Sequence, residues 1–269
     1  MTEPFWEKLF SPGEFEWAFR MRQGDAGTFF QQQDKTGGLL REKRLGLDKH
    51  PERYLASIPG SENLVKGIWK LALEMGHLDK PADGSRNLEG LARSWEADLL
   101  VMDLESKKVV AAAVCFPSSW DPAGAVGKTL DEVHGVVPRL NLQIGVMIDR
   151  FLDKVSPGKS YCRENWSFTR TQDLDYHPKV GRRKLDESVT LDELFLRVEH
   201  QLFTGIAGGV LMGIRIETCP LTDLAADPGI WRAVAEKIGT MPHDVAVYKS
   251  MDSATHQILE EMKTYQAIN

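Results

Sequence analysis

Apolar side chains recur at helical spacing in the first third of the chain. After Ser61, a favourable N-cap residue, four apolar residues at intervals of four, three and four lie on one side of a helix: Leu64, Ile68, Leu71 and Met75. Two shorter helices and two connections complete this part: helices at Trp6–Phe10 and Phe15–Met21, connections at Gly37–Leu47 and Pro81–Arg86. These patterns predict a helical N-terminal extension over residues 1–92.

Beyond Trp95 the apolar residues gather in short runs typical of strands. The predicted strands cover residues 99–104, 109–116, 161–171, 194–203 and 210–218. Short polar or glycine-containing breaks join the first two and the last two, which predicts two β-hairpins. Residues 190–193 also fit a capping box that would open a helix. The alternation of Arg197, Glu199 and Gln201 with apolar neighbours favours the strand.

Three further helices follow from the same patterns. They cover residues 140–155, 253–265 and the segment from Asp227 towards Ile238, where Asp-Pro supplies an N-cap and a first-turn proline. The predicted fold class is α+β, with an antiparallel sheet of about five strands and covering helices over residues 93–269. The N-terminal extension is expected to pack on this core.

Composition excludes several classes of protein. The 269 residues carry 33 Lys and Arg against 39 Asp and Glu, for a net charge of −6. A nucleic-acid or anionic-membrane partner is not expected, because such surfaces carry a basic excess. The longest apolar run, Val109–Phe116, is too short to span a membrane, and no secretory signal is visible. Three scattered cysteines support no disulfide framework, so a cytoplasmic location is expected.

Familiar catalytic motifs are incomplete in this chain. Gly124 to Thr129 resembles a phosphate-binding loop, but Pro122 stands where its first glycine is required. The glycines at 205–213 lead into a strand, whereas a dinucleotide fingerprint leads into a helix. The seven histidines lack zinc-ligand spacing, and no nucleophile elbow is present. Single-histidine ligation, as in haem proteins, would leave no spacing pattern to detect.

A few polar residues remain as candidates. His134 ends a short amphipathic turn in which Leu130 and Val133 point inward, and spacing alone favours a helix-terminal histidine stabilised by the helix dipole. Arg163 and Asn165 share one face of a strand, and Arg197, Glu199 and Gln201 share one face of another. Each polar face is either the solvated side of the sheet or the wall of a pocket.

Several segments, in order, resemble the haem-dependent oxidative N-demethylase (dimethylamine monooxygenase) alpha-subunit family. The clearest are Ala113–Trp120, Val126–His134, Val137-Pro138, Arg163–Ser167, Leu196–Leu202 and Val210–Arg215 leading to Pro220-Leu221. Leu55–Glu62 and Glu96–Leu100 fit more loosely. Individually these segments are weak signals, but their joint order is specific.

The resemblance implies a PAS-like fold, in which a five-stranded antiparallel sheet holds haem b against a helix. His134 would then be the axial ligand of the iron, and the strand from Arg163 to Trp166 would lie near the other side of the haem. Lys128 and Arg139 flank the ligand and could pair with the haem propionates, although surface solubility explains each equally well.

The resemblance also implies an activity. Such an enzyme would use O₂ to oxidise a methyl group of a small methylated amine, releasing formaldehyde and the demethylated amine. Four residues are candidates for polarising oxygen and orienting the amine: Arg163, Asn165, Glu199 and Arg215. Electrons would come from a separate reductase that uses NADPH, FMN and a 2Fe–2S cluster. Tetrahydrofolate would be the one-carbon acceptor.

Two departures leave alternatives open. His200 stands where the family pattern has arginine, and Thr204-Gly205-Ile206 replaces a downstream Leu-Pro pair. These differences put dimethylamine itself in doubt and make His200 a candidate for a second histidine beside the haem. A haem-binding gas sensor without turnover, or a haem-free relative with another ligand, are the competing hypotheses.

Overall fold

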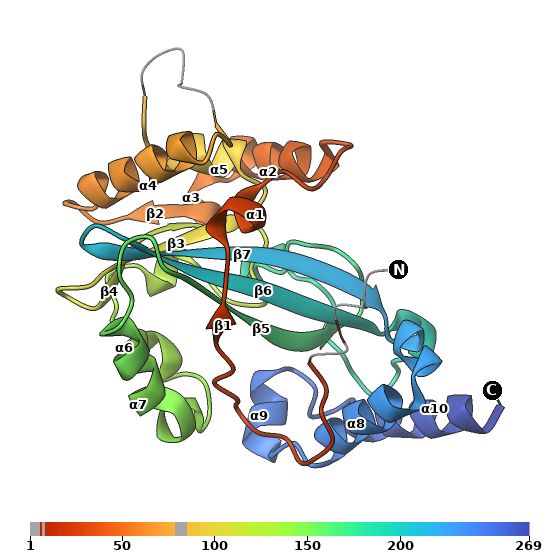
Figure 1. Ribbon diagram of the computed structural model, residues 1–269. Helices are drawn as coiled ribbons and strands as arrows, with labels where there is room; N and C mark the ends of the chain where they lie inside the picture. The colour runs from red at the N-terminus through yellow and green to blue at the C-terminus, as the bar shows by residue number, and fades with distance from the viewer. Residues whose placement is uncertain (1–5, 7–8, 79–84, 269) are drawn as a thin grey trace.

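The residues predicted as strands pair into one antiparallel sheet (Figure 1). The computed structural model describes residues 6, 9–78 and 85–268. The strands are β1 (Arg22–Gln23), β2 (Leu55–Ser57), β3 (Asp98–Asp103), β4 (Lys108–Ala113), β5 (Ser160–Thr169), β6 (Phe195–Ile206) and β7 (Gly209–Pro220). Their spatial order is β1-β5-β6-β7-β3-β4-β2. All five predicted strands are confirmed, but the sheet has seven.

The two additional strands come from the N-terminal part of the chain. β1 pairs with β5 at one edge of the sheet, and β2 pairs with β4 at the other. The predicted helix at Phe15–Met21 is wrong, because no residue of that segment is helical. Its backbone is held by other elements instead: the Phe15 N–H donates to Thr240 Oγ1, and the Trp17 N–H donates to Gln143 Oε1. The predicted helix at Trp6–Phe10 lies partly outside the described residues.

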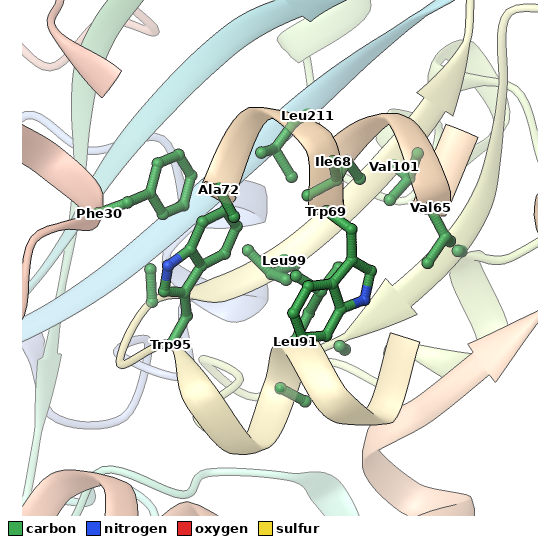
Figure 2. Packing of buried hydrophobic residues seen from close by; sticks show 14 of the residues in the cluster. Phe30, Val65, Ile68, Trp69, Ala72, Leu91, Trp95, Leu99, Val101 and Leu211 are labelled. Atoms are coloured by element: carbon green, nitrogen blue, oxygen red, sulfur yellow. The ribbon is translucent and has the colours of Figure 1, made fainter. Parts of the chain in front are cut away.

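Five helices cover one face of the sheet (Figure 1). They are α1 (Ala26–Phe30), α2 (Gly38–Lys49), α3 (Pro51–Tyr54), α4 (Glu62–Glu74) and α5 (Leu88–Ser94). Figure 2 shows the apolar layer beneath them, where Trp95 stacks on Phe30 with ring centroids 4.4 Å apart. The α4 helix is confirmed, but its most buried residues are Val65, Ile68, Trp69 and Ala72, and three of the four predicted stripe residues are only half-buried.

The prediction of a connection at Gly37–Leu47 is wrong, because these residues form most of α2. The pattern was hidden by a lysine on the buried side of the helix. Lys43 is fully buried, and its ammonium lies 3.0 Å from Asp98 Oδ1 and donates to three backbone carbonyls. Burying a charge is costly unless it is paired and hydrogen-bonded in this way. A sequence pattern that scores lysine as exposed therefore misses the helix.

The remaining helices lie below the strands in the view of Figure 1. They are α6 (Leu130–His134) and α7 (Leu140–Leu152), with α8 (Pro228–Gly239), α9 (His243–Tyr248) and α10 (Thr255–Ile268) towards the other end. The predicted helices at 140–155, 227–238 and 253–265 are confirmed, and Asp227 caps α8 by accepting the N–H groups of Gly229 and Ile230. Residues 191–193 form a single 3-10 turn before β6, so the strand prediction holds.

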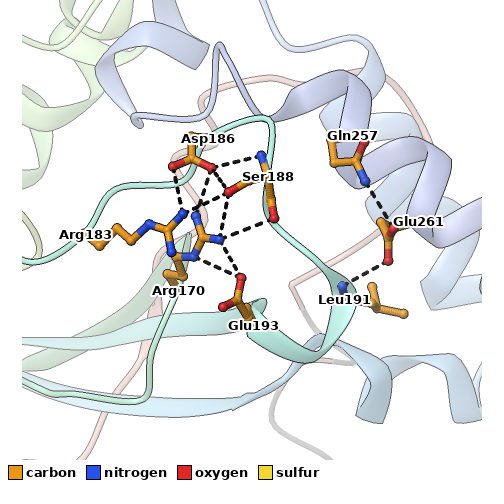
Figure 3. A network of polar contacts seen from close by, with 8 residues as sticks. All are labelled: Arg170, Arg183, Asp186, Ser188, Leu191, Glu193, Gln257 and Glu261. Atoms are coloured by element: carbon orange, nitrogen blue, oxygen red, sulfur yellow. Dashed lines mark hydrogen bonds and ion pairs between the residues drawn. The ribbon is translucent and has the colours of Figure 1, made fainter.

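A polar network fixes the connection between β5 and β6 (Figure 3). The buried guanidinium of Arg170 lies 3.0 Å from Asp186 Oδ1 and 2.5 Å from Glu193 Oε2, and it also donates to Ser188. Bidentate and charge-assisted hydrogen bonds of this kind are directional as well as strong. The network therefore sets the end of β5 and the start of β6, the two strands that carry most of the candidate polar residues.

Candidate functional site

His134 is placed by a short and well-defined helix. Thr129 and Glu132 form a reciprocal capping box that starts α6, and Leu130 and Val133 pack against the apolar cluster under β3, β4 and β7. The prediction of a short amphipathic turn ending at His134 is confirmed. The helix has only five residues, so its packing and its cap hold the position of the imidazole.

The imidazole of His134 is neutral at neutral pH. Burial, together with the positive charge of Arg163, lowers its pKa to about 4. No hydrogen bond joins the ring to any residue that the structure describes. A neutral imidazole with a free nitrogen lone pair is the form that binds a metal ion.

Next to this helix, β5 and β6 present a row of polar side chains. Arg163 lies opposite Gln201 and Asn165 lies opposite Glu199 in the register of the two strands. Glu199 Oε2 accepts a hydrogen bond from Gln201 at 2.9 Å and a weaker one from Asn165 at 3.5 Å. Glu199 is 8% exposed and Gln201 is 9% exposed, so on β6 this face is not the solvated side of the sheet.

Arg163 is the least satisfied group in the row. Its Nε is buried and has no hydrogen-bond partner in the described part of the chain. Burial lowers the pKa of the guanidinium, and the carboxylate of Glu199 opposes that effect. Buried donors are nearly always paired in folded proteins, so an unpartnered one marks a place where a ligand can supply the acceptor.

Sequence reasoning missed the contribution of α9. Lys249, which follows this helix, donates from Nζ to the Trp166 carbonyl at 2.7 Å. Its ammonium lies 5.1 Å from the ring centroid of Trp17 and 5.0 Å from that of Trp166, which are cation–π distances. Burial and the charge of Arg163 lower the pKa of Lys249 to about 8, while Glu199 opposes them. Burial and the Glu199 charge also raise the pKa of Tyr248.

The other predicted cofactor-binding residues lie in different surroundings. The side chain of Lys128 is exposed. Arg139 forms an ion pair with Asp244 at 2.9 Å and so joins the segment between α6 and α7 to α9. Trp166 is half-buried against Phe10 and Phe15 and beside Lys249. Their roles towards a cofactor stay predictions.

Arg215 does not join the group around His134. It lies on the opposite face of the sheet, beside a cavity of about 640 Å³, where it pairs with Glu96 at 2.8 Å and donates to the carbonyls of Phe29 and Gln31. Arg215 lies opposite His200 in the strand register and therefore shares its face of the sheet. Glu199 is the neighbour of His200 along β6, so Glu199 and Arg215 point to opposite faces.

His200 lies beside the same second cavity and is held as a cation. Its Nε2 is 3.1 Å from Glu217 and its Nδ1 is 3.9 Å from Glu164. These carboxylates outweigh the effect of burial and raise the pKa of His200 to about 9. A protonated imidazole has no lone pair for a metal, so this geometry is unsuited to a second histidine ligand.

The structure thus defines a mixed α/β protein in which a neutral histidine faces a sheet carrying under-paired cationic side chains. The chain matches the family model described as haem-dependent oxidative N-demethylase, alpha subunit-like, over residues 46–259. Because this match covers most of its length, the chain belongs to that family. A search of curated proteins finds no match. Among the described residues, no helix is long and apolar enough to cross a membrane.

The residues on this face fit the haem that the family description implies. The neutral imidazole of His134 could bind the haem iron, and the unpartnered Nε of Arg163 could donate to a carboxylate of the haem or of a substrate. Within the described ranges, no group of three or more His, Cys, Asp or Glu side chains could hold a metal ion. Haem needs only one protein ligand, so a single imidazole such as that of His134 would be enough to hold it.

Proposed function

We propose that this protein binds haem b through His134 and oxidatively demethylates a small methylated amine. Family membership supports the haem and the reaction class, and the observation that carries the site is the neutral imidazole of His134 facing Arg163. When bound, the haem would supply the iron at which O₂, two electrons and two protons convert an N-methyl group to formaldehyde, with loss of water.

The order of the strands supports a PAS-like arrangement for the inner part of the sheet. Without β1 and β2, the order is β5-β6-β7-β3-β4, so β3, the first strand of this core, lies between β4 and the last strand, β7. Both α6 and α7 belong to the connection between β4 and β5, and they lie against the sheet on the face opposite α1–α5. A cofactor held by His134 would therefore be sandwiched between this connection and the strands β5 and β6.

The chain's own residues would then bind and orient the substrate. Glu199 is the nearly buried carboxylate of the polar row, and it can pair with the ammonium form of an amine. Asn165 and Gln201 hold that carboxylate in place through their amide groups. Arg163 supplies an N–H donor that no described residue uses. Trp17 and Trp166 border the same region, because both rings lie against the ammonium of Lys249.

Electron delivery belongs to the same proposal. The resemblance implies a separate reductase with NADPH, FMN and a 2Fe–2S cluster, and tetrahydrofolate as acceptor of the one-carbon product. These partners are testable once the demethylation itself is established.

A peroxide-driven assay tests the activity without a reductase. Hydrogen peroxide carries both the oxygen atom and the electrons, so an N-methyl amine and peroxide give the demethylated amine, formaldehyde and water. The haem-loaded protein should release formaldehyde from a methylated amine, whereas haem-free protein should not. A protein that binds haem and carbon monoxide but yields no formaldehyde from any amine would be a gas-binding protein instead. A protein that takes up no haem would contradict the proposal outright.

A further inference from the structure

A small cavity lies beside the free edge of β5, beneath the N-terminal segment at residues 15–18. It measures about 70 Å³ and is lined by both Trp17 and Trp166. That volume holds several water molecules, or a group of a few heavy atoms, since one water needs about 10 to 15 Å³ by this measure. Five cationic side chains and two carboxylates border it: Arg20, Arg22, Arg163, Lys237 and Lys249, with Glu16 and Glu164.

Three of the five cations already have partners. Arg22 pairs with Glu164, and Arg20 lies 3.6 Å from Glu16. Lys237 donates to the carbonyls of Gly13 and Glu14 and so anchors the N-terminal segment to α8. The two carboxylates that border the cavity are therefore already engaged: Glu16 by Arg20, and Glu164 by Arg22 and His200.

The other two cations lack an anionic partner within the described part of the chain. Arg163 has a buried, unpartnered Nε, and the ammonium of Lys249 donates to a single backbone carbonyl. Besides burial, the charge of Arg163 contributes to lowering the pKa of Lys249, whereas the carboxylate of Glu199 raises the pKa of both cations; Glu164, already paired with Arg22, also raises that of Arg163. Two half-buried cations that share Glu199 as their one carboxylate not already paired with another cation leave room for one further negative charge.

We propose that this cavity binds the carboxylate of the substrate, so that the substrate class is an N-methyl amino acid rather than a plain alkylamine. This inference rests on the proposed demethylation and specifies its substrate. An alkylammonium ion alone would add positive charge to a group that already has an excess. An N-methyl amino acid brings one charge of each sign, so its ammonium can pair with Glu199 while its carboxylate pairs with Arg163 and Lys249.

A haem propionate carries the same chemical group, so the experiment must separate the two sources. Haem-free protein serves this purpose, because a substrate carboxylate can still bind to it. Trp17 and Trp166, two of the seven tryptophans, flank Lys249, so ligand binding at this cavity should change the tryptophan fluorescence, and a Trp17→Phe variant assigns the change to this place. The titrants are N-methylglycine, dimethylamine, which lacks the carboxylate, and acetate, which lacks the amine.

We expect N-methylglycine to change the fluorescence and to bind at least about tenfold more tightly than dimethylamine, because charge-assisted hydrogen bonds to the carboxylate are added. Acetate should bind weakly at the same place and compete with N-methylglycine. Equal affinities for the two amines, or no competition by acetate, would overturn the inference. Since no haem is present, this result is independent of whether haem-loaded protein turns over.

Variants then assign the site. Arg163→Gln and Lys249→Gln should each weaken N-methylglycine binding about tenfold or more. The matched control is Arg20→Gln, which removes a cation of the same cavity that already has a partner and should leave the affinity unchanged. Thermal melting confirms that each variant is folded, and Lys249→Met, which also removes the charge, replaces Lys249→Gln should that variant fail to fold. If Arg163→Gln and a folded Lys249 variant without the charge impair haem uptake but leave N-methylglycine binding intact, the cavity serves a haem propionate and the inference is wrong.

Discussion

The two faces of the sheet use the same kinds of side chain in opposite ways. On one face, His200, Arg215 and their carboxylates form closed ion pairs around the larger cavity. On the other face, His134 is neutral and the charges of Arg163 and Lys249 lack anionic partners in the described structure. The charged groups on the first face are neutralised by partners within the protein. The groups on the second face have bonding capacity left over, which we attribute to a bound ligand.

This difference has a physical cause in the pleat of the strands. Successive residues of β6 point to opposite faces, so Glu199 and His200 belong to different environments although they are neighbours in sequence. Desolvated charges cost free energy when they are unpaired, and that cost is retained at binding sites because the ligand removes it. Charged groups on the paired face should therefore matter for stability, and those on the unpaired face for binding.

The largest expected effect on stability concerns the buried ion pair of Arg215. Replacing it by Met leaves the Glu96 carboxylate, which is 1% exposed, without its cation. We expect the free energy of unfolding to fall by about 3 kcal/mol, as for other buried pairs that lose one member. Urea denaturation measures it, with Arg232→Met on the exposed side of α8 as the control. A loss as small as the control's would show that the paired face contributes little.

A smaller effect is expected from His200 and depends on pH. Its pKa is about 9 in the folded protein against an ordinary value of 6.5, so the folded state holds the proton more tightly. The resulting stabilisation is complete below pH 6.5, falls as the pH rises towards 9 and is absent above it. We expect it to amount to about 2 kcal/mol, because the imidazole is partly exposed to solvent.

The measurement for His200 compares the wild type with His200→Gln by urea denaturation at pH 6 and pH 10. The difference in unfolding free energy between the two proteins should shrink at the higher pH. A difference that stays constant, or that grows with pH, contradicts the assignment of a charged His200.

The smallest effect on stability is expected where the charge is unpaired. In haem-free protein, Arg163→Met should change the free energy of unfolding by less than about 1 kcal/mol, and towards greater stability, because a half-buried cation with an unpartnered Nε is removed. The same urea titration measures this effect. A loss as large as that of Arg215→Met would show that Arg163 has a structural partner and would remove the contrast between the two faces.

The sheet could be predicted because its strands carry their own signal. Alternating polar and apolar residues in β6 and the paired apolar runs of β3 and β4 depend only on local sequence. The α2 helix could not be predicted, because Lys43 on its buried side is satisfied by a distant carboxylate, Asp98. The edge strands β1 and β2 are too short to show a period.

The candidate site was predictable only in part. His134 followed from the family resemblance, and Arg163, Asn165 and Glu199 followed from strand alternation, which the register brings together. Lys249 gives no local signal, because its contact with Trp166 joins residues 83 positions apart. The sequence does not reveal the register between β6 and β7, and this register decides which of their side chains share a face of the sheet. For this reason sequence alone cannot separate Arg215 from Arg163, Asn165 and Glu199.

The central claim is that the imidazole of His134 binds the iron of haem, and the absorption spectrum of a glycine variant tests it most directly. Haem-loaded wild-type protein should show the Soret band of a histidine-ligated haem. We expect His134→Gly to lose that band and free imidazole to restore it, because the small ligand can occupy the vacated space. His243→Gly, at the exposed start of α9, is the control and should leave the spectrum unchanged. A His134→Gly spectrum identical to that of the wild type would contradict the claim.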